Sequence, residues 1–383
     1  MKRPVIITVK RSAIGKVGGM FKHLEPEQLV APIIKHIIET YQIDRNSIDE
    51  VILGNAIGPG GNIARVAALH ANLPVEIPAI TLDRQCGSGL EAINYACRLI
   101  QASAGDMYLA GGVESSSLAP WRMAKPKSLY EMPQLYDRAP FSTPEIGDPS
   151  MGIAADNVAK AFHISREAQD EFAYWSHQKA IHAQEENVFA DEIVPIHGKT
   201  IDEGPRKALS LSFLRRLKPA FSKGGTVTAG NACPINDGAA IALIMSSEKA
   251  KTLGLQPKLH FIDATSAGVD PNILGIGPVP AVKKLLHRQN LHINDIGLVE
   301  FNEAFASQVL ASMQALQIKE TTLNKSGGAI AFGHPYGASG AILVSRLCTE
   351  IERTNTKYAL ATLGIAGGLG LATLFAKDSY NNE

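Results

Sequence analysis

A cysteine and a histidine, each set among small residues, are the side chains best suited to covalent chemistry. Cys86 lies in the tract R-Q-C-G-S-G-L, and His334 lies in the tract G-H-P-Y-G-A-S-G. A thiolate attacks electrophilic carbon, and an imidazole can take the thiol proton near neutral pH. Small neighbours let a substrate approach the backbone closely. The pair predicts nucleophilic catalysis, with a buried structural cysteine and a turn histidine as the alternatives.

The elements around Cys86 predict how its thiol is activated. The apolar run 78–82 is typical of a strand, and apolar periodicity over 90–100 predicts a helix just after the tract. Unpaired N–H groups and the positive end of the dipole at a helix N-terminus favour an anion. We therefore expect the helix to favour the Cys86 thiolate.

Two further tracts place polar or flexible residues at predicted strand ends, where ligands gather in α/β proteins. Asn302 lies in F-N-E-A-F, between a predicted strand and a helix, and residues 364–370 read G-I-A-G-G-L-G. Asn302 could instead cap the helix that follows it. Glu303 is expected to orient the loop, and Cys97 and Cys348 are expected to be helical core residues.

The chain resembles itself weakly at a spacing of about 250 residues, which indicates a duplicated domain. Residues 48–56 resemble 293–304, and residues 87–93 resemble 337–343. The predicted helices are 26–41, 62–71 and 90–102 in the first half and 279–289, 303–317 and 338–353 in the second. Strands that alternate with helices predict parallel-type sheets covered on both faces. We expect two α/β halves with a site between them.

The segment 118–230 interrupts this repeat. It begins rich in proline, methionine and basic residues, and then predicts helices over 153–161 and 165–186. We predict three units: an N-terminal half at 1–117 plus 231–254, an inserted loop domain at 118–230, and a C-terminal half at 255–383.

Composition argues against several classes of function. The 383 residues are 45% hydrophobic and carry 37 basic and 37 acidic side chains, so no charge surplus suggests nucleic acid or an anionic membrane. Four cysteines without a C-x-x-C pair argue against a disulfide framework or a structural zinc site. No apolar stretch is long enough to span a membrane. We expect a cytoplasmic protein with no metal and no permanently bound cofactor.

Taken together, the tracts resemble those of the thiolase family over essentially the whole chain. They are C-x-S-G at Cys86, N-E-A-F at Asn302, G-H-P-x-G-A-S-G at His334, and G-T-V-T-A-G-N-A at 225–232. The resemblance implies a layered α-β-α-β-α core and a reversible Claisen condensation or thiolysis of acyl-CoA, with CoA as substrate. It also implies a homodimer or a homotetramer.

The resemblance further implies roles for individual residues. Cys86 would carry the acyl group, and His334 would accept the cysteine proton. A water held by Asn302 and His334 would form one oxyanion site, and the N–H groups of Cys86 and Ala366 would form the other. Four residues would line the CoA and pantetheine path: Met151, Ser150, Ala232 and Cys233. Three basic residues of the insertion could meet phosphate or lie on a solvated face: Arg122, Lys125 and Lys127.

The sequence departs from the family where a second catalytic cysteine is usual. Gly364 stands there, and a hydrogen atom cannot accept a proton. Ala304 stands where some relatives carry that thiol instead. Cys233 replaces a serine beside the expected substrate channel, and Ser150 replaces a histidine. We hypothesise that Cys233 takes over the acid/base role, and a substitute of similar size is the alternative.

Two other functions stay open at this point. An enzyme without the second thiol could condense by decarboxylation, which needs no base for an α-proton, or could pass its acyl group to another nucleophile. A protein that binds CoA without catalysis is a third possibility, against which the intact Cys86, Asn302 and His334 argue.

Overall fold

The computed structural model describes residues 1–377 of the chain. Its strands are β1 (Pro4–Arg11), β2 (Gly15–Lys16), β3 (Glu50–Gly54), β4 (Ala79–Leu82), β5 (Met107–Glu114), β6 (Arg122–Ala124), β7 (Gln134–Tyr136), β8 (Asn236–Ser246), β9 (Leu259–Gly268), β10 (Ile296–Phe301), β11 (Tyr358–Ile365) and β12 (Leu369–Ala376). Its α-helices are α1 (Pro26–Thr40), α2 (Ile63–His70), α3 (Ser88–Gln101), α4 (Met151–Ala161), α5 (Arg166–Glu185), α6 (Leu211–Arg215), α7 (Ser247–Thr252), α8 (Pro278–Arg288), α9 (Ala306–Leu316), α10 (Ala329–Phe332) and α11 (Tyr336–Arg353).

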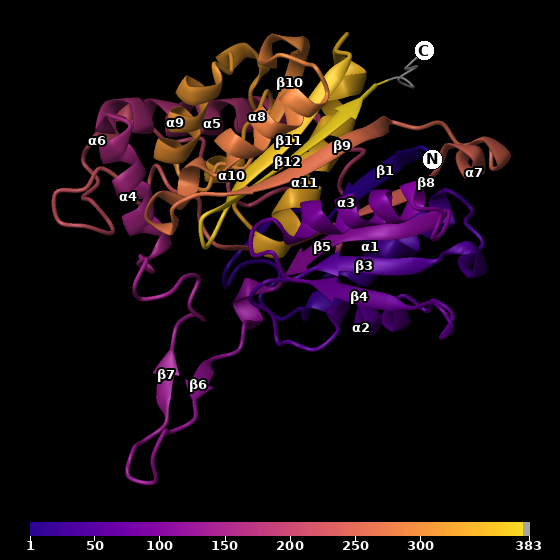
Figure 1. The fold of residues 1–383 in the computed structure, drawn as a ribbon, viewed down its shortest axis with the longest axis horizontal. Coiled ribbons are helices and arrows are strands. Elements are labelled where there is room, and N and C mark those ends of the chain that lie inside the picture. The colour runs from indigo at the N-terminus through magenta and orange to yellow at the C-terminus, as the bar shows by residue number, and fades with distance from the viewer. Residues whose placement is uncertain (378–383) are drawn as a thin grey trace.

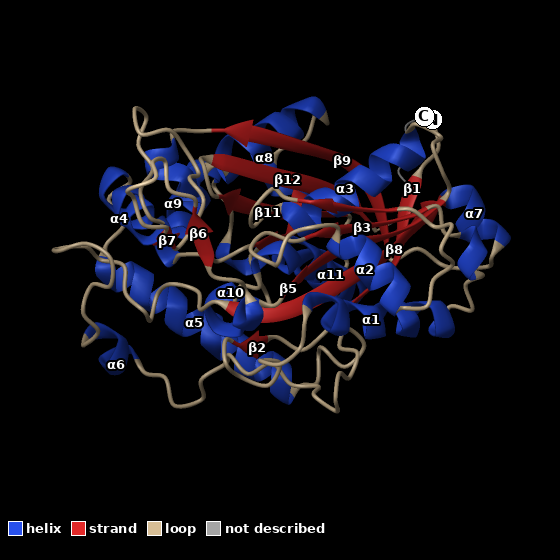
Figure 2. Cartoon of the chain, turned by 90° about the horizontal axis from the view of Figure 1, so that it is seen from below, coloured by secondary structure: helices blue, strands red, loops and turns tan. Residues whose placement is uncertain are grey.

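The strands form one long sheet in the order β10-β11-β12-β9-β1-β8-β5-β3-β4, with β2 paired to β8. Helices α3 and α11 contact strands from both parts of this sheet and lie between them (Figure 1). Helices α1 and α2 cover one outer face, and α8 covers the other, as Figure 2 shows from below. This is the predicted α-β-α-β-α layering, because each sheet face buries its apolar side chains against helices.

The strand directions correct one expectation, since the sheet is mixed and not of parallel type. Strands β4, β3 and β5 run parallel, and so do β10 and β11. The pairs β5–β8, β8–β1, β1–β9, β9–β12 and β12–β11 are antiparallel. A three-residue turn joins β11 to β12, and a hairpin connection gives antiparallel neighbours. The repeat therefore shows α/β order along the chain but a mixed sheet in space.

The two central helices approach each other closely because glycine lines their contact. A Cβ at Gly89 of α3 would lie 2.5 Å from the carbonyl oxygen of Gly337, and a Cβ at Gly340 of α11 would lie 2.4 Å from the backbone nitrogen of Leu90. No side chain larger than hydrogen fits at these two positions without a shift. This contact sets the distance between the two helix N-termini, where Cys86 and His334 are found.

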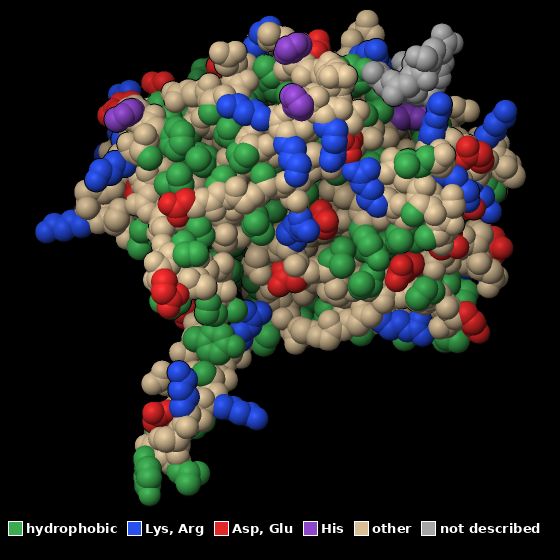
Figure 3. Space-filling view, viewed as in Figure 1, with side chains coloured by type: hydrophobic (Ala, Val, Ile, Leu, Met, Phe, Trp, Pro, Cys, Tyr) green, Lys and Arg blue, Asp and Glu red, His purple; other side chains and the backbone are tan. Residues whose placement is uncertain are grey.

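The segment after β5 leaves the body of the molecule as a long arm, defined here as residues 119–141 and containing β6 and β7 (Figure 1). Its tip exposes apolar side chains, which Figure 3 shows in green: Leu129 and Tyr130 are each 98% exposed. Helices α4 and α5, which match the predicted helical stretches, then return to the body. The three-unit division stays a prediction, and the last six residues of its third unit lie outside the described residues.

Within residues 1–377, no helix has the length and apolar character needed to cross a membrane. Cys97 and Cys348 are buried in the core between the layers, as expected for helical core residues.

Candidate active site

Cys86 is presented by a tight, strained turn between β4 and α3. Gln85, just before it, has a φ of 48°, a left-handed conformation that costs energy for a residue with a side chain. Two side chains hold this turn: Asp83 accepts a 2.8 Å hydrogen bond from the Gln85 N–H, and Ser88 accepts one of 2.8 Å from the Arg84 N–H. The Ser88 hydroxyl also donates to the Gln85 carbonyl at 2.6 Å. The tract around Cys86 is thus a hydrogen-bonded turn that fixes the position of the Cys86 thiol.

Burial dominates the chemistry of the Cys86 thiol. Only 6% of the residue is exposed, and this desolvation raises the pKa of Cys86 to about 12. The N–H groups of Cys86 and Ala366 act in the opposite direction, because both donate toward the sulfur. The expected thiolate at the helix N-terminus is therefore not the resting state of this structure. A neutral thiol needs a base to remove its proton in the reaction.

His334 can serve as that base because it is held neutral. Burial lowers the pKa of His334 to about 4, so the ring is unprotonated near neutral pH. Its Nδ1 lies 2.6 Å from the Ser339 hydroxyl, and its Nε2 lies 3.5 Å from the Asn302 amide nitrogen. The Tyr336 ring packs edge-on against the imidazole at 5.1 Å between centroids. Ser339 and Tyr336 were not singled out from the sequence, although both lie within five residues of His334 in the same tract.

Asn302 follows β10 and faces the histidine, and it does not cap a helix. Its backbone N–H donates to the Thr362 carbonyl of the neighbouring strand at 3.1 Å. The helix expected from Glu303 begins later, at Ala306, with Phe305 at the N-cap position. The capping alternative for Asn302 is therefore wrong, and its side-chain amide is left to face His334.

Glu303 orients the loop, as its sequence context indicates. Its carboxylate is buried and accepts hydrogen bonds from the Ser176 hydroxyl at 2.6 Å and the Asn324 amide at 2.8 Å. It also accepts one from the Ile330 N–H at 3.2 Å. These bonds tie α5, the loop after β10 and α10 together around the site.

Cys233 lies beside the nucleophile, although 147 positions separate the two cysteines in the sequence. Its N–H donates to the Ala304 carbonyl at 2.9 Å, and the Pro234 carbonyl next to it accepts a hydrogen bond from the His334 N–H at 3.2 Å. Burial first, and then the Cys86 thiol, raise the pKa of Cys233. Cys233 packs in one apolar cluster with Ala232, Phe305 and Met151, so three of the four residues predicted to line the CoA path come together. Ser150, the fourth, is exposed at the N-cap of α4.

Gly364 lies in β11 opposite Gly370, at a position where an added side chain would meet the end of the Gln308 side chain. A Cβ there would lie 2.6 Å from the Gln308 side-chain nitrogen and 3.3 Å from the Gly275 carbonyl oxygen. The Gln308 amide thus takes the space that a thiol at this position would need. The sequence shows that position 364 is glycine, and the structure shows that the Gln308 amide lies beside it.

A groove of about 610 Å³ lies next to this cluster and was not predicted from the sequence. Its lining includes Asp156, Lys160, His163, Lys223 and Thr226. The available signal was a basic segment, residues 215–223, which carries four Lys or Arg and no acid. The basic residues singled out from the sequence, Arg122, Lys125 and Lys127, do not line this groove. Lys125 and Lys127 are exposed on the arm. In the part of the chain that the structure describes, no cluster of three or more His, Cys, Asp or Glu could hold a metal ion.

Comparison with known proteins gives matches over nearly the whole chain. The family description "Thiolase, N-terminal domain" matches residues 4–248, and "Thiolase, C-terminal domain" matches residues 255–377. The chain is 51% identical to the provisionally named acetyl-CoA C-acetyltransferase VraB of Staphylococcus epidermidis, over 98% of this chain and 99% of that protein. A VraB of Staphylococcus aureus is also 51% identical, over 98% of this chain and 100% of that protein.

Two crystal structures are similar to the fold. The acetyl-CoA acetyltransferase of Bacillus anthracis has a TM-score of 0.94 and 38% identity, covering 98% of this chain and 99% of that one. Human mitochondrial 3-ketoacyl-CoA thiolase, in complex with CoA, has a TM-score of 0.93 and 34% identity, covering 99% of this chain and 98% of that one.

Proposed function

The chain belongs to the thiolase family, and on that premise we propose that Cys86, His334, Asn302 and Ala366 carry its reaction. It is a thiolase-type acyltransferase that uses acyl-CoA. The observation that supports these residues most is that α3 and α11, which begin just after Cys86 and His334, pack against each other. Tyr336 connects the two residues, because its ring packs on the His334 imidazole and its hydroxyl feels the charge of Cys86.

In the first half-reaction, the Cys86 sulfur attacks the thioester carbon of acyl-CoA. His334 Nε2 takes the thiol proton during the attack, and the N–H groups of Cys86 and Ala366 stabilise the oxyanion that forms on the carbonyl oxygen. The C–S bond to CoA then breaks, and the CoA thiolate receives the proton from His334. The products are an acyl-Cys86 thioester and free CoA, so charge and protons balance.

In the second half-reaction, a second acyl-CoA must lose an α-proton before its carbon attacks the acyl-enzyme. We assign that proton to the Cys233 sulfur, on the basis of its place beside Cys86 and the absence of a thiol at position 364. Because burial keeps Cys233 a neutral thiol at rest, His334 first takes the Cys233 proton, and the thiolate so formed takes the α-proton. Asn302 and His334 hold the water that stabilises the enolate oxygen. When the new C–C bond forms, Cys86 leaves as thiolate and receives the proton that His334 holds, so Cys86 and Cys233 end as thiols and His334 ends neutral.

The coenzyme would enter along the apolar cluster that contains Met151, Ala232 and Cys233. Its phosphates would lie at the groove near Lys160 and Lys223, since phosphate groups favour ammonium partners. Phe221 connects the two regions, because its ring contacts Phe305 of the apolar cluster and belongs to the basic segment.

The arm suggests that the enzyme works as a homodimer or homotetramer. A monomer rarely exposes several large apolar side chains together, and the arm exposes Trp121, Leu129 and Tyr130 by more than nine-tenths each. Replacing Leu129 and Tyr130 with serine is expected to reduce the mass measured by light scattering, and an unchanged mass would contradict this role of the arm.

The test of the proposed function is the mass of the intact protein after it is mixed with acetyl-CoA. We expect one acetyl group on the wild-type chain, and none on the Cys86→Ala variant. Cys97→Ala serves as the control, because Cys97 is a buried core cysteine outside the site. Acetylation that persists in Cys86→Ala would exclude Cys86 as the nucleophile.

One observation favours a second candidate, condensation by decarboxylation. Gln308 occupies the space beside Gly364, so the usual base is absent and its place is filled. A malonyl-CoA donor releases CO₂ to form the same enolate without loss of an α-proton. Product from acetyl-CoA alone that is lost in Cys233→Ser supports the thiolase reaction, whereas product only from malonyl-CoA supports the second candidate.

A further inference from the structure

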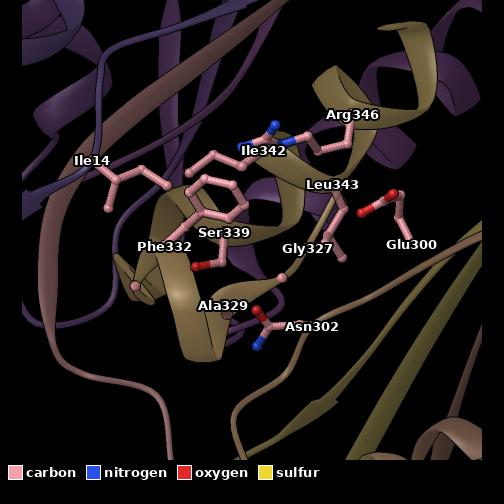
Figure 4. Close-up of a pocket in the computed structure, with 12 residues that line it drawn as sticks. Ile14, Glu300, Asn302, Gly327, Ala329, Phe332, Ser339, Ile342, Leu343 and Arg346 are labelled. Carbon is pink, nitrogen blue, oxygen red and sulfur yellow. The ribbon is translucent and has the colours of Figure 1, made fainter. Parts of the chain in front are cut away.

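A small cavity of about 30 Å³ lies beside Asn302 and Ser339, the residue whose hydroxyl contacts His334 (Figure 4). Four polar side chains line it: Glu300, Asn302, Ser339 and Arg346. Each of these residues is at least 95% buried. A buried space of this size holds about two water molecules, and several polar partners are what such waters require. The cavity is therefore suited to ordered water and not to a substrate.

Glu300 is the unusual group in this cavity, because among the described residues it forms no ion pair within 4 Å. Arg11 pairs with Glu192 at 2.7 Å and with Asp202 at 2.8 Å, and Arg346 lies 3.7 Å from Glu192. Those two arginines and two acids balance one another. Within residues 1–377, no ion pair or hydrogen bond involves the Glu300 carboxyl, so its oxygens are left to the cavity.

The charged groups around Glu300 favour its neutral form. Arg346 of α11 attracts a negative charge there, but Glu350 of α11, Glu192 and Glu303 repel it. Burial and these carboxylates raise the pKa of Glu300 well above its usual value. A neutral carboxylic acid has an O–H to donate and an oxygen to accept, which lets it end a chain of hydrogen bonds.

Ser339 connects the cavity with the histidine. Its hydroxyl lies 2.6 Å from His334 Nδ1 and also lines the cavity. A hydroxyl that accepts the Nδ1 proton can donate its own proton onward, whereas one that donates to Nδ1 forces the ring proton onto Nε2. The direction is set at the other ring nitrogen: the Asn302 amide nitrogen lies 3.5 Å from Nε2 and can only donate, which favours Nε2 as the acceptor and leaves the proton on Nδ1 for Ser339 to accept.

We infer that Ser339, water in this cavity and the Glu300 carboxyl form one hydrogen-bonded chain that accepts the Nδ1–H of His334 and so stabilises the proton on Nδ1. In this chain Nδ1–H donates to Ser339, the Ser339 hydroxyl donates to water, and the water lies against Glu300. His334 Nε2 is then left as a proton acceptor for Cys86. Ser339 and Glu300 are positioning residues, and their role rests on the proposed function of His334.

The first test reads the tautomer directly, by ¹⁵N NMR of histidine-labelled protein with His334 assigned through a His334→Gln variant. We expect the Nδ1–H form in the wild-type protein and in Ser345→Ala, and a shift toward Nε2–H in Ser339→Ala. Ser345 is a matched control, since its hydroxyl is also buried in α11 but contacts the Val9 carbonyl at 3.4 Å. An Nε2–H form in the wild-type protein would overturn the inference.

The second test measures the rate of Cys86 acetylation by acetyl-CoA against pH. Hydrogen bonds to an ionised group are worth about a tenfold to hundredfold factor in rate, so Ser339→Ala should slow acetylation by that factor and shift its pH profile. Glu300→Gln keeps a neutral donor and acceptor and should stay within about threefold of wild type, whereas Glu300→Leu breaks the chain and should resemble Ser339→Ala.

The two proposals fail in different ways. If the wild-type protein takes up no acetyl group on Cys86, the proposed function fails. If the wild-type protein is acetylated and Ser339→Ala matches its rate and pH profile, only the hydrogen-bonded chain is excluded. A rate in Glu300→Gln as low as in Glu300→Leu, with both variants folded by thermal denaturation, would also exclude the protonated Glu300.

Discussion

The two central helices begin in the same way along the chain but serve different chemistry. α3 starts just after Cys86, and α11 starts just after His334. At α3, the N–H of Cys86 is directed toward the sulfur, where an oxyanion can form. At α11, the N–H of Gly337 already donates to the Glu114 carboxylate at 3.0 Å. The two helix N-termini are thus similar along the chain, but at α11 the buried Glu114 carboxylate already accepts a backbone N–H.

Burial acts on the two residues in opposite chemical senses. It raises the pKa of Cys86 and lowers the pKa of His334, so both are neutral at rest. A resting thiolate and imidazolium pair is disfavoured, and the proton moves only when a substrate carbonyl accepts the sulfur. The site is therefore organised to stabilise the transition state more than a charged resting pair.

The largest expected effect comes from removing the base at the α11 start. His334→Ala should slow Cys86 acetylation by about 10³-fold to 10⁴-fold, because general-base catalysis supplies up to that factor. The measurement is the single-turnover rate by mass spectrometry. His177→Ala is the matched control: His177 is also buried with a pKa lowered to about 4, but it accepts its hydrogen bond from the Arg206 N–H and lies outside the site. An equal loss of acetylation rate in His334→Ala and His177→Ala would contradict a specific role of His334 as the base.

Removing the amide that faces the histidine is expected to have the next largest effect. Asn302→Ala should lower the condensation or thiolysis rate by about 10²-fold to 10³-fold, the usual cost of one oxyanion donor. Acetylation of Cys86 should fall much less, since its oxyanion lies at the N–H groups of Cys86 and Ala366. An equal fall in the rates of acetylation and of condensation or thiolysis would show that the two oxyanion sites are not separate.

The helix contact that places both starts can be broken by one methyl group. Gly89→Ala puts a Cβ against the Gly337 backbone and should lower the free energy of unfolding by about 3 kcal/mol, even though alanine favours a helix. Gly364→Ala meets chiefly the flexible end of the Gln308 side chain, with the Gly275 carbonyl oxygen farther away at 3.3 Å, and should cost about 1 kcal/mol. Denaturant titration measures the free energy of unfolding of both variants. A larger loss in Gly364→Ala than in Gly89→Ala would show that the contact at position 364 is the more rigid one.

The smallest expected effect is a pH dependence of stability. The pKa of His334 is about 4 in the folded protein and about 6.5 when unfolded, so the unfolded state binds the proton first as pH falls. This group's stabilisation is complete above pH 6.5 and declines toward pH 4, by about 2 kcal/mol at pH 5. His334→Gln should show a flatter profile between these limits. An equally steep profile in that variant would mean that His334 is not held neutral by the fold.

The sequence alone determined the elements and the tracts. The helix expected over 26–41 spans Pro26–Thr40, and those expected over 279–289 and 338–353 are α8 and α11, because the period of apolar residues is a property of neighbours in the chain. It also showed that position 364 is glycine and that a cysteine stands at position 233.

Only the tertiary structure decided which residues meet and what charge they carry. No local pattern in the sequence specifies three of these contacts. They are the proximity of Cys233 to Cys86, the Gln308 amide beside Gly364, and the Ser339 hydroxyl against His334. The expected Cys86 thiolate was wrong because desolvation sums over every residue that packs around the sulfur, whereas the sequence displays only the helix that follows it. The prediction of parallel-type sheets was wrong for a related reason, because the direction of a strand depends on where distant parts of the chain return to the sheet.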